Sequence, residues 1–210
     1  MKSFFFFTLT LISIFANAKV LQKALEKYSG AATIQFDIHK IDEKIILGTK
    51  SESSGLLKFQ KNKIYILQEG EKKVEIFYVD KTLSLVEYPD ADFGPDGKRK
   101  ITILKNSAPP LIKSLLSLFS NPKTFSKEFS VVSEKTVDDL LVLELKPKQK
   151  NIKNLVLKVR PTDSSLIELS FVDDVETKTT LQFSNLKLNS KMKSSDFQYK
   201  SLKTDEVMTQ

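Results

Sequence analysis

Few residues of this chain have the types and spacing that chemistry needs. The sequence holds one histidine, His39, and no cysteine. His39 stands at a polar position of an alternating segment, where a lone histidine is most often a surface residue. No second candidate base completes a Ser–His–Asp set, and a chain without cysteine has neither thiol chemistry nor disulfides. We therefore assign no catalytic residue and predict that the protein is not an enzyme.

The acidic residues occur where turns are expected. Asp138-Asp139 and Asp173-Asp174 stand between apolar segments, and aspartate is a frequent turn residue. The loop at 90–97 resembles a calcium loop only loosely, because its third aspartate and its glycine are displaced from the EF-hand positions. No glycine pattern for phosphates or dinucleotides is present. We therefore predict no metal and no cofactor.

Apolar and polar residues alternate along most of the chain, and this is the period of β-strands. Such rows occur at 34–38, 57–59, 64–66, 74–76, 83–85, 101–103, 141–145, 155–159, 167–171 and 181–183. Leu186 and Leu188 have the opposite parity from Leu181 and Phe183, which predicts a bulge near 184–185. Consecutive hairpins of this kind favour a meander or an open barrel.

Two segments have a helical period instead. Residues 19–28 form one short amphipathic segment that Ser29-Gly30 ends. A second segment, at 107–126, interrupts the strands and is predicted to hold a single amphipathic helix that ends at Asn121-Pro122. Its polar face is predicted to consist of Lys113, Ser114, Ser117 and Ser120.

The N-terminus has the pattern of an export signal. Lys2 precedes an apolar run at 4–15, and Ala16-Asn17-Ala18 supplies small residues at Ala16 and Ala18, the positions that a signal peptidase reads. The run is shorter than the roughly 20 residues that span a bilayer. We predict a signal peptide at 1–18 and one domain at 19–210, located outside the cytoplasm. No cysteine follows Ala18, so the mature chain is expected to carry no lipid of its own.

The chain is basic, with 33 Lys and Arg against 26 Asp and Glu and a formal charge of +7. Such an excess favours solubility, and attraction to anionic lipid or to an acidic partner is the sharper alternative. Nucleic acid is disfavoured, because the chain is predicted to be exported and lacks interleaved aromatic and basic residues.

Several stretches, in their order along the chain, carry a likeness to one family. They are Glu52–Phe59 (ESSGLLKF), Val79–Leu83 (VDKTL), Leu143–Lys148 (LELKPK), Leu169–Asp173 (LSFVD), Thr179–Asn185 (TTLQFSN) and Asp196–Tyr199 (DFQY). In this order they resemble the LolA family of periplasmic outer-membrane lipoprotein carriers. The chain departs from the family pattern in having no tryptophan and no double proline after Tyr199.

The resemblance implies a mainly β (α+β) fold: an unclosed antiparallel β barrel with an N-terminal helix and a helical lid over its concave apolar face. It also implies a monomeric carrier protein that binds the acyl chains of lipoproteins. Its partners would be acylated lipoproteins, an inner-membrane ATP-driven lipoprotein exporter and an outer-membrane acceptor.

The resemblance also assigns roles to residues. The lipid-binding concave face would consist of Ile34, Phe36, Leu57, Phe59, Ile64, Ile66, Leu85, Leu143, Leu145, Leu157, Leu169 and Phe171. The lid would close over it with Leu111, Leu115, Leu116 and Phe119. Lys61 stands where the family usually has arginine and would take part in lid gating, with weaker hydrogen bonds because lysine lacks the bidentate fork.

Other interpretations stay open at this point. The helix at 111–119 is also compatible with a fixed core helix that has no cavity beneath it. The protein is also compatible with a periplasmic sensor of lipids or lipoproteins, or with a carrier of glycolipid or phospholipid.

Overall fold

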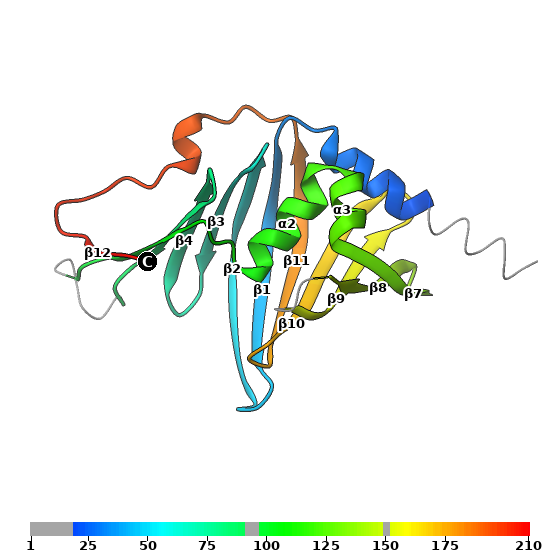
Figure 1. Cartoon of the computed structure of the whole chain (residues 1–210), viewed down its shortest axis with the longest axis horizontal. Coiled ribbons are helices and arrows are strands. Elements are labelled where there is room, and N and C mark those ends of the chain that lie inside the picture. Colours follow the sequence, from blue (N-terminus) through cyan, green and yellow to red (C-terminus); the bar gives the residue numbers. More distant parts are fainter. Residues whose placement is uncertain (1–18, 91–96, 149–151) are drawn as a thin grey trace, which may run out of the picture.

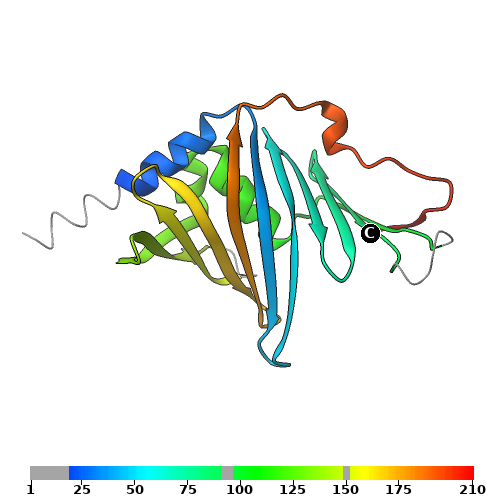
Figure 2. The ribbon, with the colours of Figure 1, turned by 180° about the vertical axis from the view of Figure 1, so that it is seen from behind.

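The computed structural model describes residues 19–90, 97–148 and 152–210. Within these residues, twelve strands form one sheet in the order β12-β6-β5-β4-β3-β2-β1-β11-β10-β9-β8-β7 (Figures 1 and 2). The strands are β1 (Ile34–Lys44), β2 (Thr49–Gln60), β3 (Lys63–Glu69), β4 (Lys73–Val79), β5 (Thr82–Glu87), β6 (Lys100–Lys105), β7 (Phe129–Val137), β8 (Leu140–Pro147), β9 (Ile152–Arg160), β10 (Ser165–Asp173), β11 (Thr177–Leu188) and β12 (Glu206–Thr209). Neighbours are antiparallel except β12 and β6, which are parallel.

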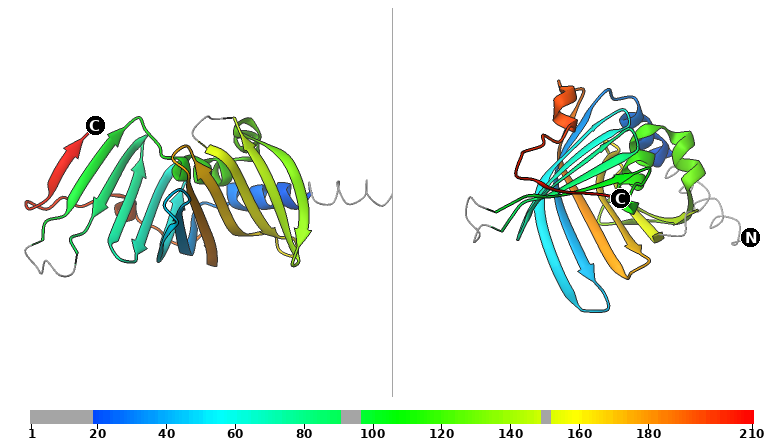
Figure 3. Two further views of the ribbon diagram at one scale, coloured as in Figure 1. Left: turned by 90° about the horizontal axis from the view of Figure 1, so that it is seen from below. Right: turned by 60° about the vertical axis from the view of Figure 1, so that its left-hand side comes forward.

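The sheet curves into a trough whose two ends stay apart, so the barrel is open (Figure 3). β12 forms one end and β7 the other. This confirms the predicted fold class, a mainly β protein with an unclosed, almost wholly antiparallel sheet. The curvature follows from the right-handed twist that each pair of neighbouring strands adds.

Helices cover one side of the trough. One lies at residues 19–29, and α2 (Pro110–Ser120) and α3 (Pro122–Glu128) follow β6. The segment at 107–126 was predicted to hold a single helix ending at Asn121-Pro122, but a second helix, α3, follows the first. Pro122 ends the first, as expected, but Asn121 then caps the second by accepting a 2.8 Å hydrogen bond from the backbone N–H of Thr124.

The strand order explains why these helices lie over the trough. β6 lies near one end of the sheet and β7 is the strand at the other end, so the chain between them must cross the whole sheet. It crosses on the concave side as α2 and α3 (Figures 1 and 3). α2 is therefore held at both ends by the chain and can move away from the sheet only by swinging on these connections.

The sheet has apolar clusters on both faces. The larger cluster fills the concave face beneath the helices. A smaller one, Phe77, Val86 and Ile101, lies on the convex face of β4, β5 and β6. A C-terminal arm packs there: it contains the 3₁₀ helix η2 (Ser194–Phe197), Tyr199 and β12.

The predicted bulge is present in β11. The register of β1 against β11 shifts between Gln35 and Asp37, so residues 185–186 stand opposite Phe36. Asn185 has a φ of 50°, a conformation that asparagine tolerates well. Its side-chain N–H donates a 2.7 Å hydrogen bond to Asp37 Oδ2. The bulge bends the strands at the β1–β11 pair, near the centre of the sheet.

Gly55 allows two central strands to approach closely. A Cβ atom at this position would lie 1.9 Å from the carbonyl oxygen of Leu67 in β3. Any larger residue would therefore push β2 away from β3 along the pair that lines the trough.

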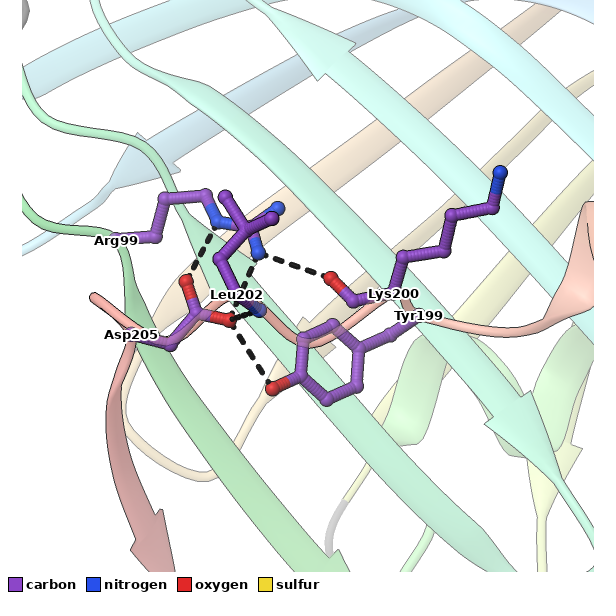
Figure 4. A network of polar contacts seen from close by, with 5 residues as sticks. All are labelled: Arg99, Tyr199, Lys200, Leu202 and Asp205. Carbon is purple, nitrogen blue, oxygen red and sulfur yellow. Dashed lines mark hydrogen bonds and ion pairs between the residues drawn. The ribbon is translucent and has the colours of Figure 1, made fainter.

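The C-terminal arm is held by one polar network (Figure 4). Arg99 donates two hydrogen bonds of 2.8 Å to the carboxylate of Asp205, from Nε and from Nη2. The backbone N–H of Leu202 and the hydroxyl of Tyr199 donate to the same carboxylate, at 2.7 and 3.2 Å. These bonds, those of Arg99 first, hold the pKa of Asp205 below its ordinary value of 3.8.

This network predicts how the arm responds to acid. A carboxyl whose pKa is lowered by folding stabilises the folded arm fully above the unfolded pKa and loses that effect as the pH falls through the folded pKa. The backbone amide signal of Leu202 should therefore titrate in NMR spectra with a midpoint below pH 3.8. The Asp205→Asn variant should show no such titration. A wild-type midpoint at or above 3.8 would contradict the role given to Arg99.

Candidate functional site

The predicted concave-face residues come together beneath the helices, with one exception. Eleven of them are at most 5% exposed and belong to one cluster: Ile34, Phe36, Leu57, Phe59, Ile64, Ile66, Leu143, Leu145, Leu157, Leu169 and Phe171. Leu85 differs, because it is only partly buried and lies outside both clusters. It is on β5, two residues beyond Leu83, which is 3% exposed and belongs to the buried cluster.

The helix α2 closes this face with the residues predicted for the lid. Leu115 and Phe119 are 0% and 1% exposed, Leu111 is at 9%, and Leu116 is partly buried against the same cluster. The ring of Phe119 lies 5.3 Å from that of Phe59 and 6.2 Å from that of Phe36. In the arrangement described, α2 therefore packs directly against the apolar face of the trough.

The helix at 19–29 is anchored more firmly than α2. The hydroxyl of Tyr28, which is 2% exposed, accepts a 2.7 Å hydrogen bond from the backbone N–H of Leu166 in β10. Burial raises the pKa of Tyr28 to about 12, so the hydroxyl stays neutral at ordinary pH. Its ring also lies 5.6 Å from that of Phe119. Tyr28 thus gives α2 a fixed wall to pack against.

Contacts between α2 and the sheet are apolar. Across the part of the chain that the structure describes, no hydrogen bond or ion pair links α2 to a strand. The predicted polar face was wrong for Ser114 and Ser117, which are 0% and 3% exposed, with hydroxyls that have no hydrogen-bond partner. An unpaired buried hydroxyl costs about 1–3 kcal/mol. These two residues therefore weaken the closed position of α2.

An apolar groove opens beside the closed face. It has a volume of about 530 Å³ and lies between the helix at 19–29, α3 and β7. Leu25 and Leu143 line it and also belong to the buried cluster, so the groove leads toward the concave face. Val131 and Val132, on the strand at the open end of the sheet, are 44% and 60% exposed.

Lys61 lies in the tight turn between β2 and β3, with a φ of 54°. It is exposed, and no hydrogen bond or ion pair joins it to α2 among the residues described. Its assignment to lid gating stays a prediction.

The other side chains considered for catalysis or metal binding make hydrogen bonds or ion pairs with neighbouring residues. His39 Nδ1 lies 3.2 Å from Ser54 Oγ, and its Nε2 lies 3.2 Å from Glu52 Oε2. Asp90 forms an ion pair with Lys72 at 3.3 Å. Most of the loop considered for calcium, 91–96, lies outside the described residues, as do Ala16 and Ala18 of the expected signal peptide. In the described ranges, no group of acidic or histidine side chains could hold a metal ion, and no helix is long and apolar enough to cross a membrane.

The fold and the site define a protein with a helix-covered apolar trough, an architecture suited to binding apolar ligands. Residues 95–200 match the model of the outer membrane lipoprotein carrier protein family, LolA. The match covers about half of the chain, and the chain belongs to this family. Proteins of this family are carriers or binding proteins. None of the curated proteins compared with the chain matches it.

Several solved structures resemble the chain at low identity. An uncharacterized conserved protein from Thermus thermophilus is 9% identical, with 92% of this chain and 99% of that chain covered and a TM-score of 0.49. A LolA superfamily protein from Nitrosomonas europaea is 10% identical, with 87% and 97% covered and a TM-score of 0.41. A putative outer membrane lipoprotein-sorting protein domain from Vibrio parahaemolyticus is 11% identical, with 85% and 94% covered and a TM-score of 0.43.

Proposed function

We propose that this protein is a periplasmic carrier that binds the acyl chains of lipoproteins released from the inner membrane and delivers them to the outer membrane. The observation that carries the proposal is the apolar face of the trough, closed by a helix that only apolar contacts hold against it. Each exposed CH₂ of an acyl chain costs about 0.8 kcal/mol in water, so a lipoprotein needs such a face to cross an aqueous space.

The apolar lining suits carriage better than selective recognition. Aliphatic and aromatic side chains contact methylene groups without directional bonds, so chains of different length can bind and leave. We propose that the signal peptide at 1–18 directs export, that the domain at 19–210 acts as a monomer, and that an ATP-driven exporter and an outer-membrane acceptor are its two partners. Leu111, Leu115, Leu116 and Phe119 are the proposed lid. The eleven predicted concave-face residues that are buried in the cluster are the proposed acyl-chain site.

Photo-crosslinking in the periplasm tests the proposal. A photoreactive residue in place of Leu115, which points into the trough, should capture acylated lipoproteins. The matched control is the same residue in place of Lys123, which is exposed on α3. Mass spectrometry of the captured material separates the alternatives, because glycolipid or phospholipid in place of lipoprotein would overturn the proposed cargo.

Depletion of the protein supplies a second test. A carrier should be needed for lipoproteins to reach the outer membrane, so depletion should leave them at the inner membrane. Normal sorting in depleted cells would contradict carriage and would favour a sensor on the same fold.

A further inference from the structure

The three most exposed large apolar side chains of the described residues, Ile46, Val175 and Leu47, lie at or beside the tip of the β1–β2 hairpin. Ile45, Ile46 and Leu47 follow one another in its loop and are 49%, 76% and 68% exposed. Val175, in the turn between β10 and β11, is 70% exposed. The two turns lie side by side, because the backbone N–H of Ile45 donates a 3.0 Å hydrogen bond to the carbonyl of Glu176.

This tip projects from the body of the protein. β1 and β2 pair without interruption to Lys44 and Thr49, but β3 joins β2 only from Ser54 onward. The hairpin therefore extends past β3 by about five residues, which is about 16 Å at the rise of a β-strand. Figures 1 and 2 show it at the end of the sheet away from the helix at 19–29.

Several backbone N–H groups of the two turns are paired within the tip. The N–H groups of Ile45 and Leu47 donate to the carbonyls of Glu176 and Lys44, at 3.0 and 3.1 Å. The side chain of Asp173 accepts from the N–H groups of Val175 and Thr177, at 3.1 and 2.8 Å. Unpaired backbone groups are the main cost of placing a loop in an apolar phase. These bonds reduce that cost at Ile45, Leu47, Val175 and Thr177.

The size and charge of the tip indicate what it contacts. A stable protein interface takes about 20–30 residues from each partner, far more than one loop and one turn offer. Charge does not favour an anionic partner either, because residues 40–52 contain three lysines and three carboxylates. A small apolar tip on a projecting hairpin is instead suited to insertion at the boundary between the headgroups and the acyl chains of a lipid bilayer.

We propose that Ile45, Ile46, Leu47 and Val175 form a membrane-contact tip that inserts into the outer part of a lipid bilayer. Insertion is driven by apolar burial and is therefore largely insensitive to salt. The tip would bring the trough up to the membrane from which, or to which, a lipid is moved. This use of the tip rests on the proposed carrier function, whereas insertion itself rests on the geometry described above.

The chain contains no tryptophan, so one introduced residue reports without interference. The Ile46→Trp variant should show blue-shifted emission with phosphatidylcholine vesicles and should be quenched by brominated phosphatidylcholine. The matched control is Val207→Trp, at a position that is 51% exposed on β12 at the far end of the sheet. It should show neither effect. Equal quenching of both variants, or of neither, would overturn the proposal.

Partition measurements supply the size and the cause of the effect. The double variant Ile46→Asp, Leu47→Asp should lower vesicle partitioning at least about 30-fold, since each side chain loses its burial in the bilayer. Thermal unfolding of this variant should stay unchanged, because both residues are exposed. Adding phosphatidylglycerol or raising the salt should change partitioning little. A fall of about tenfold in high salt would assign binding to the lysine-rich surface and overturn the proposal.

Two further outcomes keep this inference separate from the carrier function. Capture of acyl chains from position 115 should persist in the Ile46→Asp, Leu47→Asp variant, since the trough is untouched. If position 115 captures no acyl chain in the protein with its natural tip, while Ile46→Trp still inserts into vesicles, the carrier function is wrong and the membrane contact stands. A dimer in sedimentation experiments that disappears in the double variant would mean that the tip binds a second copy, and would overturn the proposal.

Discussion

In the Phe119→Ala variant, the backbone amides of 110–120 are expected to exchange with solvent at least about 100-fold faster than in the unaltered protein. Phe119 is 1% exposed, and its ring packs against those of Phe36, Phe59 and Tyr28. Truncation of a buried phenylalanine to alanine costs about 3–5 kcal/mol. Because no polar bond to a strand holds α2 within the described chain, this loss should fall directly on the closed position of the helix. Hydrogen exchange followed by mass spectrometry measures it.

The matched control is Phe77→Ala, on the opposite face of the same sheet. Phe77 is 7% exposed in the convex cluster and makes no contact with α2. Its truncation should lower the protection of the strands but leave the opening of α2 unchanged. If α2 in Phe119→Ala stays as protected as β1 and β2, α2 is a fixed core helix and the lid assignment is wrong. Phe119→Leu is a milder variant with which to repeat the experiment if the alanine variant unfolds.

The Ser114→Ala, Ser117→Ala double variant is expected to have the opposite effect and to be more stable than the natural protein. Each substitution removes a buried hydroxyl that has no partner, and alanine has the higher helix propensity. We expect the free energy of unfolding to rise by about 2 kcal/mol. A more stable closed state competes with cargo, so acyl-chain affinity should fall by about 30-fold. Thermal unfolding and titration with a fluorescent lipopeptide measure the two effects.

Ser120→Ala is the control for this pair. Ser120 lies on the same helix, is only partly buried and is not among the unpaired hydroxyls. Its removal should change both stability and affinity little. A double variant that is less stable than the natural protein would mean that the lost packing around the two side chains outweighs the relief of their unpaired hydroxyls.

The strands and their buried faces were largely predictable from the sequence. One face of most strands is buried, so apolar and polar residues alternate along them. Leu57 and Phe59 share a face with Ile64 and Ile66 as expected, and the parity change at Leu186 marks a real bulge. A second bulge was missed. Between Leu166 and Glu168 the register of β10 shifts, so that Leu166 and not Ile167 is buried. Both residues are apolar, and the pattern alone carries no signal that distinguishes them.

Other features depend on partners that are distant in the sequence. The helical period puts Ser114 and Ser117 on the face opposite the leucines, yet both are buried in the folded chain. The convex cluster was not foreseen either. Phe77, Val86 and Ile101 are buried only because the arm after β11 returns to cover them. Leu85 has the same parity as the buried Leu83 but lies further along β5, where it is only partly buried.

The pairing of β1 with β11 has a consequence for how the chain folds. Every other antiparallel pair joins strands that are consecutive in the chain, so β1–β6 and β7–β11 can each form from local hairpins. Only the seam between β1 and β11 joins residues about 150 positions apart, as in Ile34 with Leu188. Long-range pairing is slow, because the entropy of loop closure is lost before the contacts form. The two halves should therefore form early and meet late, with the apolar trough exposed until the seam closes.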